Sequence, residues 1–439
     1  MNKVYYFIGI GGIGMSSLVR YLLSRGEVVG GYDRERSELC IELEAEGAEI
    51  TYDSADTSFL ERFQSSAEVV YTAAVTDSNP QLAKAKSLGI KSTKRAQFLA
   101  EVVSTGKVLA VAGTHGKTST ATFLTHFFMH AGAAFTSFLG GISTALNSNY
   151  YSSGSDFFIV EADEFDRSFL HLHPDAAIVT SVEPDHLDIY ENPQQVITAF
   201  QQFLSQTTGP LIVHESLKGL SSSAVSYGVE TASTVQISGV EVLSDVTRFI
   251  LKDASGAMSV QVPVFGLHNL LNVTAAFTLS CLYFDRKVLV GAFDTVPLPK
   301  RRATLVRTTA TKVFYDDYAH HPSEIRAMHQ LLSSRYPDKA ITGIFQPHLF
   351  SRTRDFLDEF RSALKLFDRL IVLPIYPARE LPIAGIESSL LLKGHQNAVL
   401  VEKQELLDVL AADTSAVIVT MGAGDIAGLV PLIDKLLLR

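Results

Sequence analysis

Short apolar runs alternate with amphipathic stretches along the whole of this 439-residue chain. Apolar runs of four to eight residues are typical of buried strands, and apolar positions spaced three and four apart are typical of helices. The amino-terminal part predicts strands at Val4–Ile10 and Val28–Tyr32, with helices at Gly14–Arg25 and Ser37–Glu46. Such an alternation indicates an α/β fold whose strands are mostly parallel.

The same alternation runs through three segments, which we predict to be domains at residues 1–105, 106–299 and 300–439. The length agrees with this division, because a domain typically takes roughly 150 residues. In the central segment we expect strands at Asp156–Val160 and Ala176–Ser181, followed by a β-rich stretch at 222–265. In the third segment, strands are expected at Lys312–Tyr315, Ala340–Phe345, Leu370–Pro374 and Ala416–Met421.

One apolar run, at Val108–Ala112, leads into the turn Gly113-Thr114-His115-Gly116-Lys117-Thr118-Ser119, after which a helix is expected. In such a unit, backbone N–H groups and the positive end of the helix bind the phosphates of a nucleoside triphosphate. Lys117 would neutralise the β- and γ-phosphates, and the Thr118 hydroxyl would ligate Mg²⁺. Because Val111 stands where the usual pattern has its first glycine, a tight turn with an exposed lysine is the alternative interpretation.

Acidic residues follow two predicted strands of the central segment. Glu161, Asp163, Glu164 and Asp166 come after one strand, and Asp185-His186 comes after the next. Mg²⁺ prefers oxygen ligands and usually takes one or two carboxylates together with phosphate oxygens. His186 would ligate a second metal, with Asp185 fixing its ring. A solvated acidic loop is the alternative, but two such loops beside a phosphate loop favour a metal site.

A glycine-rich turn, Gly9-Ile10-Gly11-Gly12-Ile13-Gly14, separates the first predicted strand from the first helix. Glycines at this place allow a tight turn and the close approach of a pyrophosphate to the helix. Asp33 follows the second strand, where a carboxylate can reach a ribose hydroxyl, and Thr72-Ala73-Ala74-Val75 follows a later one. Taken alone, the turn fits NAD or FAD, so an NAD-dependent oxidoreductase is a competing hypothesis.

Polar loops also follow strands of the third segment. Asp316–Glu324 contains a His pair, but no cysteine accompanies it, so zinc is not favoured. Gln346-Pro347-His348 is followed by Arg352 and Arg354, whose guanidinium groups suit a carboxylate or a phosphate. Surface salt bridges are the alternative for either arginine. Upstream, His268-Asn269 opens a predicted helix, where Asn269 either caps the helix or meets a nucleotide.

Composition narrows the class of protein. The net charge of −10 disfavours general nucleic-acid binding, which needs clustered Lys and Arg. The chain has two cysteines, Cys40 and Cys281, which excludes a disulfide framework and fits a reducing compartment. No apolar run approaches the ~18 residues of a spanning helix. We therefore expect a soluble, cytoplasmic protein with no membrane span and no nucleic-acid partner.

Taken in chain order, these motifs resemble those of the Mur ligases of bacterial cell-wall synthesis. The resemblance rests on Gly9–Ser16, Gly113–Ser119, Glu161–Glu164, Asp185–Asp188, His268-Asn269, Asp316–Pro322, Gln346–His348 and Gly422–Ile426, which span nearly the whole chain. It implies an α/β enzyme of three domains. The N-terminal domain would be Rossmann-like and would bind a UDP-sugar. The central domain would be P-loop ATPase-like with a mostly parallel sheet. The C-terminal domain would again be Rossmann-like.

The resemblance also implies the reaction, which is the joining of L-alanine to the carboxylate of UDP-N-acetylmuramate by ATP and Mg²⁺ through an acyl phosphate. The implied catalytic residues are Lys117, Glu161, His186, His320 and Arg352, and the implied magnesium ligands are Thr118, Glu161 and His186. ATP would meet Gly113, Thr114, His115, Gly116, Lys117, Thr118, Ser119, Asn269 and Asp317. The other substrates would meet Gly11, Gly12, Ile13, Gly14, Asp33, Thr72, Tyr318 and His348. The implied partners are small molecules, and the chain would act as a monomer or homodimer.

Two departures from the family pattern refine this expectation. Leu349 follows Gln346-Pro347-His348 where the family usually has an arginine, which leaves Arg352 or Arg354 for the amino-acid carboxylate. Gln201 and Gln202 stand where peptide-extending sister enzymes often carry a carbamylated lysine. That absence is consistent with the branch that adds alanine. A family member that attaches a recycled tripeptide to UDP-N-acetylmuramate is the nearest alternative.

Overall fold

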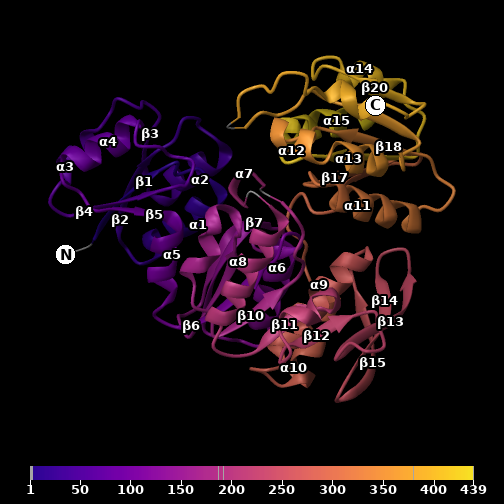
Figure 1. Cartoon of the computed structure of the whole chain (residues 1–439), viewed down its shortest axis with the longest axis horizontal. Coiled ribbons are helices and arrows are strands. Elements are labelled where there is room, and N and C mark those ends of the chain that lie inside the picture. Colours follow the sequence, from indigo (N-terminus) through magenta and orange to yellow (C-terminus); the bar gives the residue numbers. More distant parts are fainter. Residues whose placement is uncertain (1–2, 186, 191, 379, 439) are drawn as a thin grey trace. The chain divides into compact units, whose positions relative to one another are not determined.

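A computed structural model describes residues 3–185, 187–190, 192–378 and 380–438 (Figure 1). Its contacts divide the chain into two compact units, each described by itself. The first unit comprises Met1–Gln236 and Asn272–Ala292, and the second comprises Ile237–Leu271 and Phe293–Arg439. Helix α9 (Leu267–Ser280) contains one boundary between the units, which falls between Leu271 and Asn272.

The first unit begins with a five-stranded parallel sheet in the order β3-β2-β1-β4-β5. Its strands are β1 (Val4–Ile8), β2 (Val28–Tyr32), β3 (Glu49–Thr51), β4 (Ala67–Tyr71) and β5 (Ser92–Lys94). Its helices are α1 (Ile13–Ser24), α2 (Glu38–Glu46), α3 (Ser58–Arg62), α4 (Pro80–Ser87) and α5 (Arg95–Val103). The predicted elements of this segment are confirmed, although β1 ends at Ile8 because the glycine turn starts there with Gly9 at φ 83°.

The central sheet of the first unit runs β12-β11-β10-β6-β9-β7-β8, and it is parallel except at β7–β8. Its strands are β6 (Lys107–Ala112), β7 (Phe135–Ser143), β8 (Ser148–Ser152), β9 (Phe157–Ala162), β10 (Ala176–Val179), β11 (Leu211–His214) and β12 (Val225–Gly228). Its helices are α6 (Lys117–His130), α7 (Leu187–Tyr190), α8 (Pro193–Gln206) and α10 (Arg286–Val290), with 3₁₀ turns η1 (Phe165–His171) and η2 (Glu215–Leu220). One continuous buried core joins apolar residues of both sheets.

A buried hydrogen-bond network centred on Asn149 connects α1 with β8. Asn149 donates from its amide to the Ile13 carbonyl at 2.6 Å and to the Ser16 hydroxyl at 2.9 Å. Its own carbonyl accepts from the Arg20 guanidinium at 2.6 Å, and Arg20 also pairs with Glu42 and Glu46. These bonds fix the first turn of α1, just after the glycine turn, against the central sheet.

Replacing Asn149 by alanine is expected to lower the free energy of unfolding by about 2 to 4 kcal/mol, because two acceptors, the Ile13 carbonyl and the Ser16 hydroxyl, and one donor, the Arg20 guanidinium, lose their hydrogen-bond partner. Urea unfolding followed by circular dichroism measures the change. Asn397→Ala, which alters an exposed asparagine, is the matched control and should change stability little. Equal free energies of unfolding for the two variants would show that the hydrogen-bond network of Asn149 contributes nothing to stability.

The second unit contains a six-stranded sheet in the order β16-β17-β21-β18-β19-β20, parallel except at β16–β17. Its strands are β16 (Thr304–Thr308), β17 (Val313–Asp317), β18 (Ile341–Phe345), β19 (Arg369–Val372), β20 (Ala398–Leu400) and β21 (Val417–Met421). Its helices are α11 (Pro322–Arg335), α12 (Phe350–Asp355), α13 (Leu357–Leu364), α14 (Leu406–Ala411) and α15 (Val430–Leu437). Two apolar clusters pack against this sheet.

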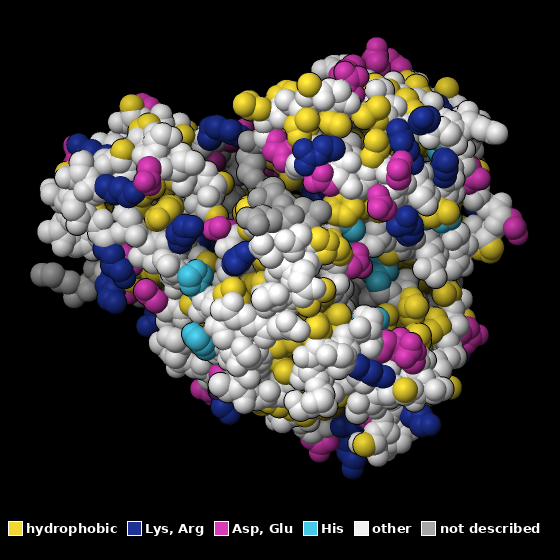
Figure 2. Space-filling view, in the orientation of Figure 1, with side chains coloured by type: hydrophobic (Ala, Val, Ile, Leu, Met, Phe, Trp, Pro, Cys, Tyr) yellow, Lys and Arg dark blue, Asp and Glu magenta, His cyan; other side chains and the backbone are white. Residues whose placement is uncertain are grey.

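The β-rich stretch expected at 222–265 is confirmed by β12 and the strands β13 (Val235–Val242), β14 (Thr247–Asp253) and β15 (Gly256–Val262). Among the described residues, no helix combines the length and the apolar character needed to cross a membrane. On the face drawn in Figure 2, Lys and Arg side chains are interspersed with Asp and Glu.

Candidate active site

The phosphate loop connects β6 to α6, as the sequence predicts. Gly113 has φ 137° and Gly116 has φ 82°, which are backbone conformations that residues other than glycine rarely adopt. A Cβ on Gly113 would lie 2.9 Å from the Ser181 backbone N, and one on Gly116 would lie 2.9 Å from the Asn272 side-chain oxygen. Both glycines are therefore required by the shape of the loop.

The loop is braced by the segment that follows β10. The Thr114 N–H donates to the Ser181 carbonyl at 3.0 Å, and the His115 N–H donates to the Ser181 hydroxyl at 2.9 Å. The Thr114 hydroxyl accepts from the Glu183 N–H at 2.8 Å. The N–H groups of Thr114 and His115 therefore donate within the protein rather than toward the helix N-terminus. The N–H groups at the start of α6, from Lys117 to Ser119, have no side-chain cap among the described residues, and they lie at the positive end of the helix.

Lys117 is held by its own loop and by an acidic residue. Its Nζ donates to the Gly113 carbonyl and to Glu164 Oε2, each at 2.6 Å. Glu164 is only 3% exposed, and its backbone carbonyl accepts from the Tyr190 hydroxyl at 2.6 Å. Burial raises the pKa of Glu164 to about 7, although Lys117 opposes that shift. Burial would lower the pKa of Lys117, but the nearby Glu164, Asp163 and Glu161 outweigh it and raise that pKa.

Thr118 and Glu161 lie together, as the metal-site prediction requires. The Thr118 hydroxyl donates to Glu161 Oε2 at 3.0 Å, and the Gly140 N–H donates to the other carboxylate oxygen. The parallel register pairs Val111 with Glu161, which places this carboxylate beside the start of the phosphate loop. A hydroxyl and a carboxylate form an all-oxygen donor set, which fits Mg²⁺. The other predicted metal ligand, His186, lies outside the described residues, while the neighbouring Asp185 is buried.

The first glycine turn is tied to the end of β2. Asp33 Oδ2 accepts from the Gly11 N–H at 2.8 Å, so Asp33 stabilises the turn itself, a role that the sequence did not indicate. A Cβ on Gly9 would lie 3.4 Å from Thr72 Cγ2, which places Thr72 beside the turn. Gly12 caps α1 in an extended conformation without a side-chain cap among the described residues. The Cys40 thiol fills the space beneath Gly11, where a side chain would clash with it.

In the second unit, Asp317 is half-buried at the end of β17. Its oxygens accept from the Ala303 N–H at 2.5 Å and the Ala319 N–H at 2.7 Å, and burial raises its pKa to about 6. The Arg302 guanidinium lies 3.8 Å from Glu324 and stacks over the Tyr318 ring, 5.1 Å from its centroid. Arg302 was not among the residues predicted from the sequence, because it belongs to no recognisable motif and only the fold brings it to this loop.

The interpretation of Asn269 as a helix cap is wrong. The Asn269 side chain donates to the Phe265 carbonyl at 2.9 Å, whereas a cap would accept from a helix N–H. Its neighbour His268 is half-buried, and burial lowers the pKa of His268 to about 4, with the charge of Arg302 adding to the effect. His268 is therefore neutral near pH 7.

Aromatic rings and one arginine gather after β17 and β18. His320 lies 6.0 Å from His348 between ring centroids, and His348 stacks on Tyr376 at 5.7 Å. The Arg352 guanidinium is 5% exposed and lies 3.5 Å from His348 Nδ1. Arg354, in contrast, is exposed and pairs with Asp355 at 2.7 Å. The fold therefore brings His320, His348 and Arg352 together and directs Arg354 elsewhere. Tyr376, which no motif indicated, joins this group.

Three mostly parallel sheets and a phosphate loop beside a carboxylate define an α/β enzyme of the nucleotide-binding class. The chain matches the Mur ligase family, catalytic domain, over residues 4–107 and the Mur ligase middle domain over residues 111–280. It also matches the Mur ligase, glutamate ligase domain over residues 301–424. The chain belongs to the Mur ligase family, and its activity class is ligation rather than nicotinamide-dependent oxidoreduction.

Relatives with known names agree with this membership. The UDP-N-acetylmuramate–L-alanine ligase of Christiangramia forsetii is 40% identical over 449 residues, covering 100% of this chain and 98% of that protein. The solved UDP-N-acetylmuramate–alanine ligase of Thermotoga maritima is 26% identical with a TM-score of 0.84, covering 99% of both chains. A murein peptide ligase from Psychrobacter arcticus, 22% identical with a TM-score of 0.72 and 99% coverage of both chains, shares the fold.

Proposed function

We propose that this chain joins L-alanine to the carboxylate of UDP-N-acetylmuramate, with ATP as the energy source. A carboxylate oxygen of the sugar attacks the γ-phosphorus of ATP, which forms an acyl phosphate and releases ADP. The amino group of L-alanine then attacks the acyl carbon, phosphate leaves, and a proton is released from the amine. The observation that carries this proposal is the contact between Thr118 and Glu161 next to Lys117, which is suited to binding a metal–triphosphate.

The phosphate-loop residues supply positioning and charge rather than covalent chemistry. Lys117 would move from the Gly113 carbonyl toward the β- and γ-phosphates, with Glu164 keeping its ammonium group in the loop. The N–H groups of Lys117, Thr118 and Ser119 would donate to phosphate oxygens. Thr118 and Glu161 would hold one Mg²⁺ and His186 a second, and the metal charge would neutralise the charge that develops on the phosphates.

The remaining ligand contacts are proposed by segment. The turn at Gly11–Gly14 and Thr72 would hold the UDP pyrophosphate, and Asn269 and Asp317 would contact ATP. Asp33 would keep the glycine turn in shape through its bond to Gly11. We place the reaction in the cytoplasm, where ATP is available, and assign three domains at residues 1–105, 106–299 and 300–439 to the UDP-sugar, to ATP and to ligation.

The direct test measures phosphate release with UDP-N-acetylmuramate, ATP and Mg²⁺ while the amino acid is varied among L-alanine, glycine and L-serine. We expect L-alanine to give the highest kcat/KM. Because one methyl or hydroxyl discriminates only about 1–3 kcal/mol in a simple pocket, glycine and L-serine should react more slowly but measurably. Release that depends on a tripeptide and not on L-alanine would support the recycling enzyme instead.

Arg352 is proposed to bind the carboxylate of L-alanine, because Leu349 cannot and Arg354 is engaged with Asp355. Arg352→Ala should raise the KM for L-alanine by about 10- to 100-fold, since a hydrogen bond to a charged group is lost. Arg354→Ala is the matched control and should change this KM less than about threefold. A larger effect at Arg354 than at Arg352 would reverse the assignment.

A further inference from the structure

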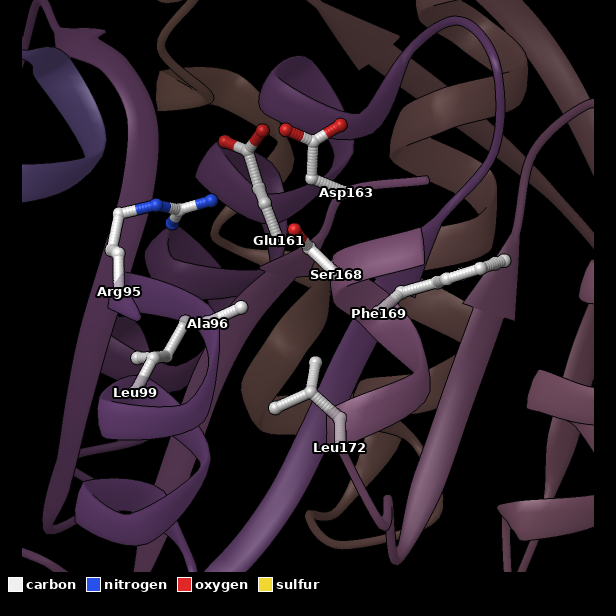
Figure 3. Close-up of a pocket in the computed structure, with 8 residues that line it drawn as sticks. All are labelled: Arg95, Ala96, Leu99, Glu161, Asp163, Ser168, Phe169 and Leu172. Carbon is white, nitrogen blue, oxygen red and sulfur yellow. The ribbon is translucent and has the colours of Figure 1, made fainter. Parts of the chain in front are cut away.

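A pocket of the first unit brings an arginine of α5 to the acidic loop after β9. Figure 3 shows the Arg95 guanidinium pointing from the start of α5 toward the carboxylate of Glu161, with Asp163 beside it. Ser168 and Phe169 of η1 complete the opposite wall. The pocket therefore joins the first domain segment to the carboxylate that we assign to the metal.

The same guanidinium also lies against the first glycine turn. A Cβ on Gly14 would lie 3.0 Å from Arg95 Nη1, 3.3 Å from Cζ and 3.5 Å from Nε. The absence of a side chain at Gly14 therefore leaves the space that the guanidinium occupies. Arg95 stands between the turn that would hold the pyrophosphate and Glu161.

The Arg95 guanidinium makes no direct ion pair with a carboxylate of the described residues. Within the part of the chain that the structure describes, the guanidinium has no hydrogen bond and no ion pair, even though Glu161 and Asp163 line the same pocket. Its neighbour Lys94, in contrast, pairs with Asp166 at 3.2 Å. A partly enclosed guanidinium presents five N–H donors and is stabilised by an anionic, oxygen-rich partner.

We propose that Arg95 is a substrate-binding residue that takes an anionic group of the nucleotide sugar. This inference rests on the proposed function, and it goes beyond it by assigning a residue outside every recognised motif. Two groups of that substrate share the required chemistry, namely the diphosphate and the muramoyl carboxylate. The position beside Gly14 favours the diphosphate, since α1 begins there.

The test measures binding of UDP and of UDP-N-acetylmuramate by calorimetry to the full chain and to Arg95→Ala, Arg95→Lys and Arg62→Ala. Arg62 is an exposed arginine of the same sheet region that pairs with Glu49, so its variant is the control. We expect Arg95→Ala to weaken UDP-N-acetylmuramate binding by about 10- to 100-fold, and Arg95→Lys to weaken it less, because charge is kept but the two-pronged geometry is lost. In turnover, the KM for UDP-N-acetylmuramate should rise while the KM for ATP stays within about twofold.

The two nucleotides separate the possible outcomes. Weaker binding of both UDP and UDP-N-acetylmuramate identifies the diphosphate as the group, and weaker binding of UDP-N-acetylmuramate alone identifies the carboxylate. Unchanged binding of both by Arg95→Ala, with a wild-type chain that binds them, overturns the inference alone. A wild-type chain that binds neither nucleotide overturns the proposed function together with it. Thermal unfolding of each variant checks that the fold persists.

Discussion

Replacing Lys117 by alanine is expected to lower the rate of ADP formation by at least about 100- to 1000-fold, as for the loss of other preorganised groups that stabilise transition-state charge. The reason is that Lys117 is the cation placed at the start of α6, beside Thr118 and Glu161. The measurement is ADP release at saturating ATP, UDP-N-acetylmuramate and L-alanine. Wild-type turnover in this variant would refute the phosphate-loop assignment.

The same substitution should also destabilise the fold in a pH-dependent way. Glu164 is buried, and without the Lys117 ammonium its ionised form costs about 3–5 kcal/mol. The folded-state pKa of Glu164, about 7, already lies above its ordinary value of 4.5, so the folded protein keeps a proton that the unfolded chain releases. The contribution of protonated Glu164 to stability is therefore present at low pH, and it is lost as the pH rises from 4.5 to about 7. In Lys117→Ala the folded-state pKa rises further, so the loss extends to higher pH.

Urea unfolding at pH 6 and pH 8.5 measures this effect, and the variant should lose more stability at pH 8.5. The double variant Lys117→Ala with Glu164→Gln separates the two roles of Lys117. It should recover most of the lost stability, because no buried charge remains, yet it should not recover ADP formation. Recovery of activity in the double variant would mean that Lys117 acts only through Glu164.

Replacing Glu161 by glutamine should raise the magnesium concentration for half-maximal activity by at least about tenfold. The substitution keeps the size of the side chain and its acceptor for the Gly140 N–H, but it removes the negative charge beside Thr118. A magnesium titration of the ADP-forming rate gives the midpoint. Asp156→Asn is the matched control, because Asp156 is an exposed carboxylate that directly precedes the start of β9. Identical titrations of the two variants would contradict the ligand role of Glu161.

The sequence was sufficient to locate the loops of the site but not their internal contacts. Parallel strands end at one edge of a sheet, so Gly113–Ser119 and Glu161–Glu164 were expected at the same edge. That the two loops are neighbours follows from the pairing of β6 with β9. That Glu161 rather than Asp163 contacts Thr118 follows from the β6–β9 register, which pairs Val111 with Glu161. The register depends on residues about fifty positions apart, and no local pattern reveals it.

Two residues make contacts within the protein that sequence reasoning did not predict. Asp33 was expected to reach a ribose hydroxyl, yet its carboxylate accepts from the Gly11 N–H. Asn269 was expected to cap a helix or meet a nucleotide, and its amide donates to the Phe265 carbonyl. Both side chains are short and polar, and such groups bond to whichever backbone group the packing brings within reach.

By itself, the sequence determined the α/β architecture, the order of the motifs and the glycines without which the turns cannot form, because these depend on local periodicity and on backbone freedom. Only the tertiary structure decided that Glu164 holds Lys117, that Arg352 rather than Arg354 is buried beside His348, and that Arg95 reaches Gly14 and Glu161. Except for Arg352 and His348, which are four residues apart, these pairings join segments far apart along the chain. They are set by strand order, register and helix packing, which act over distances that no sequence motif spans.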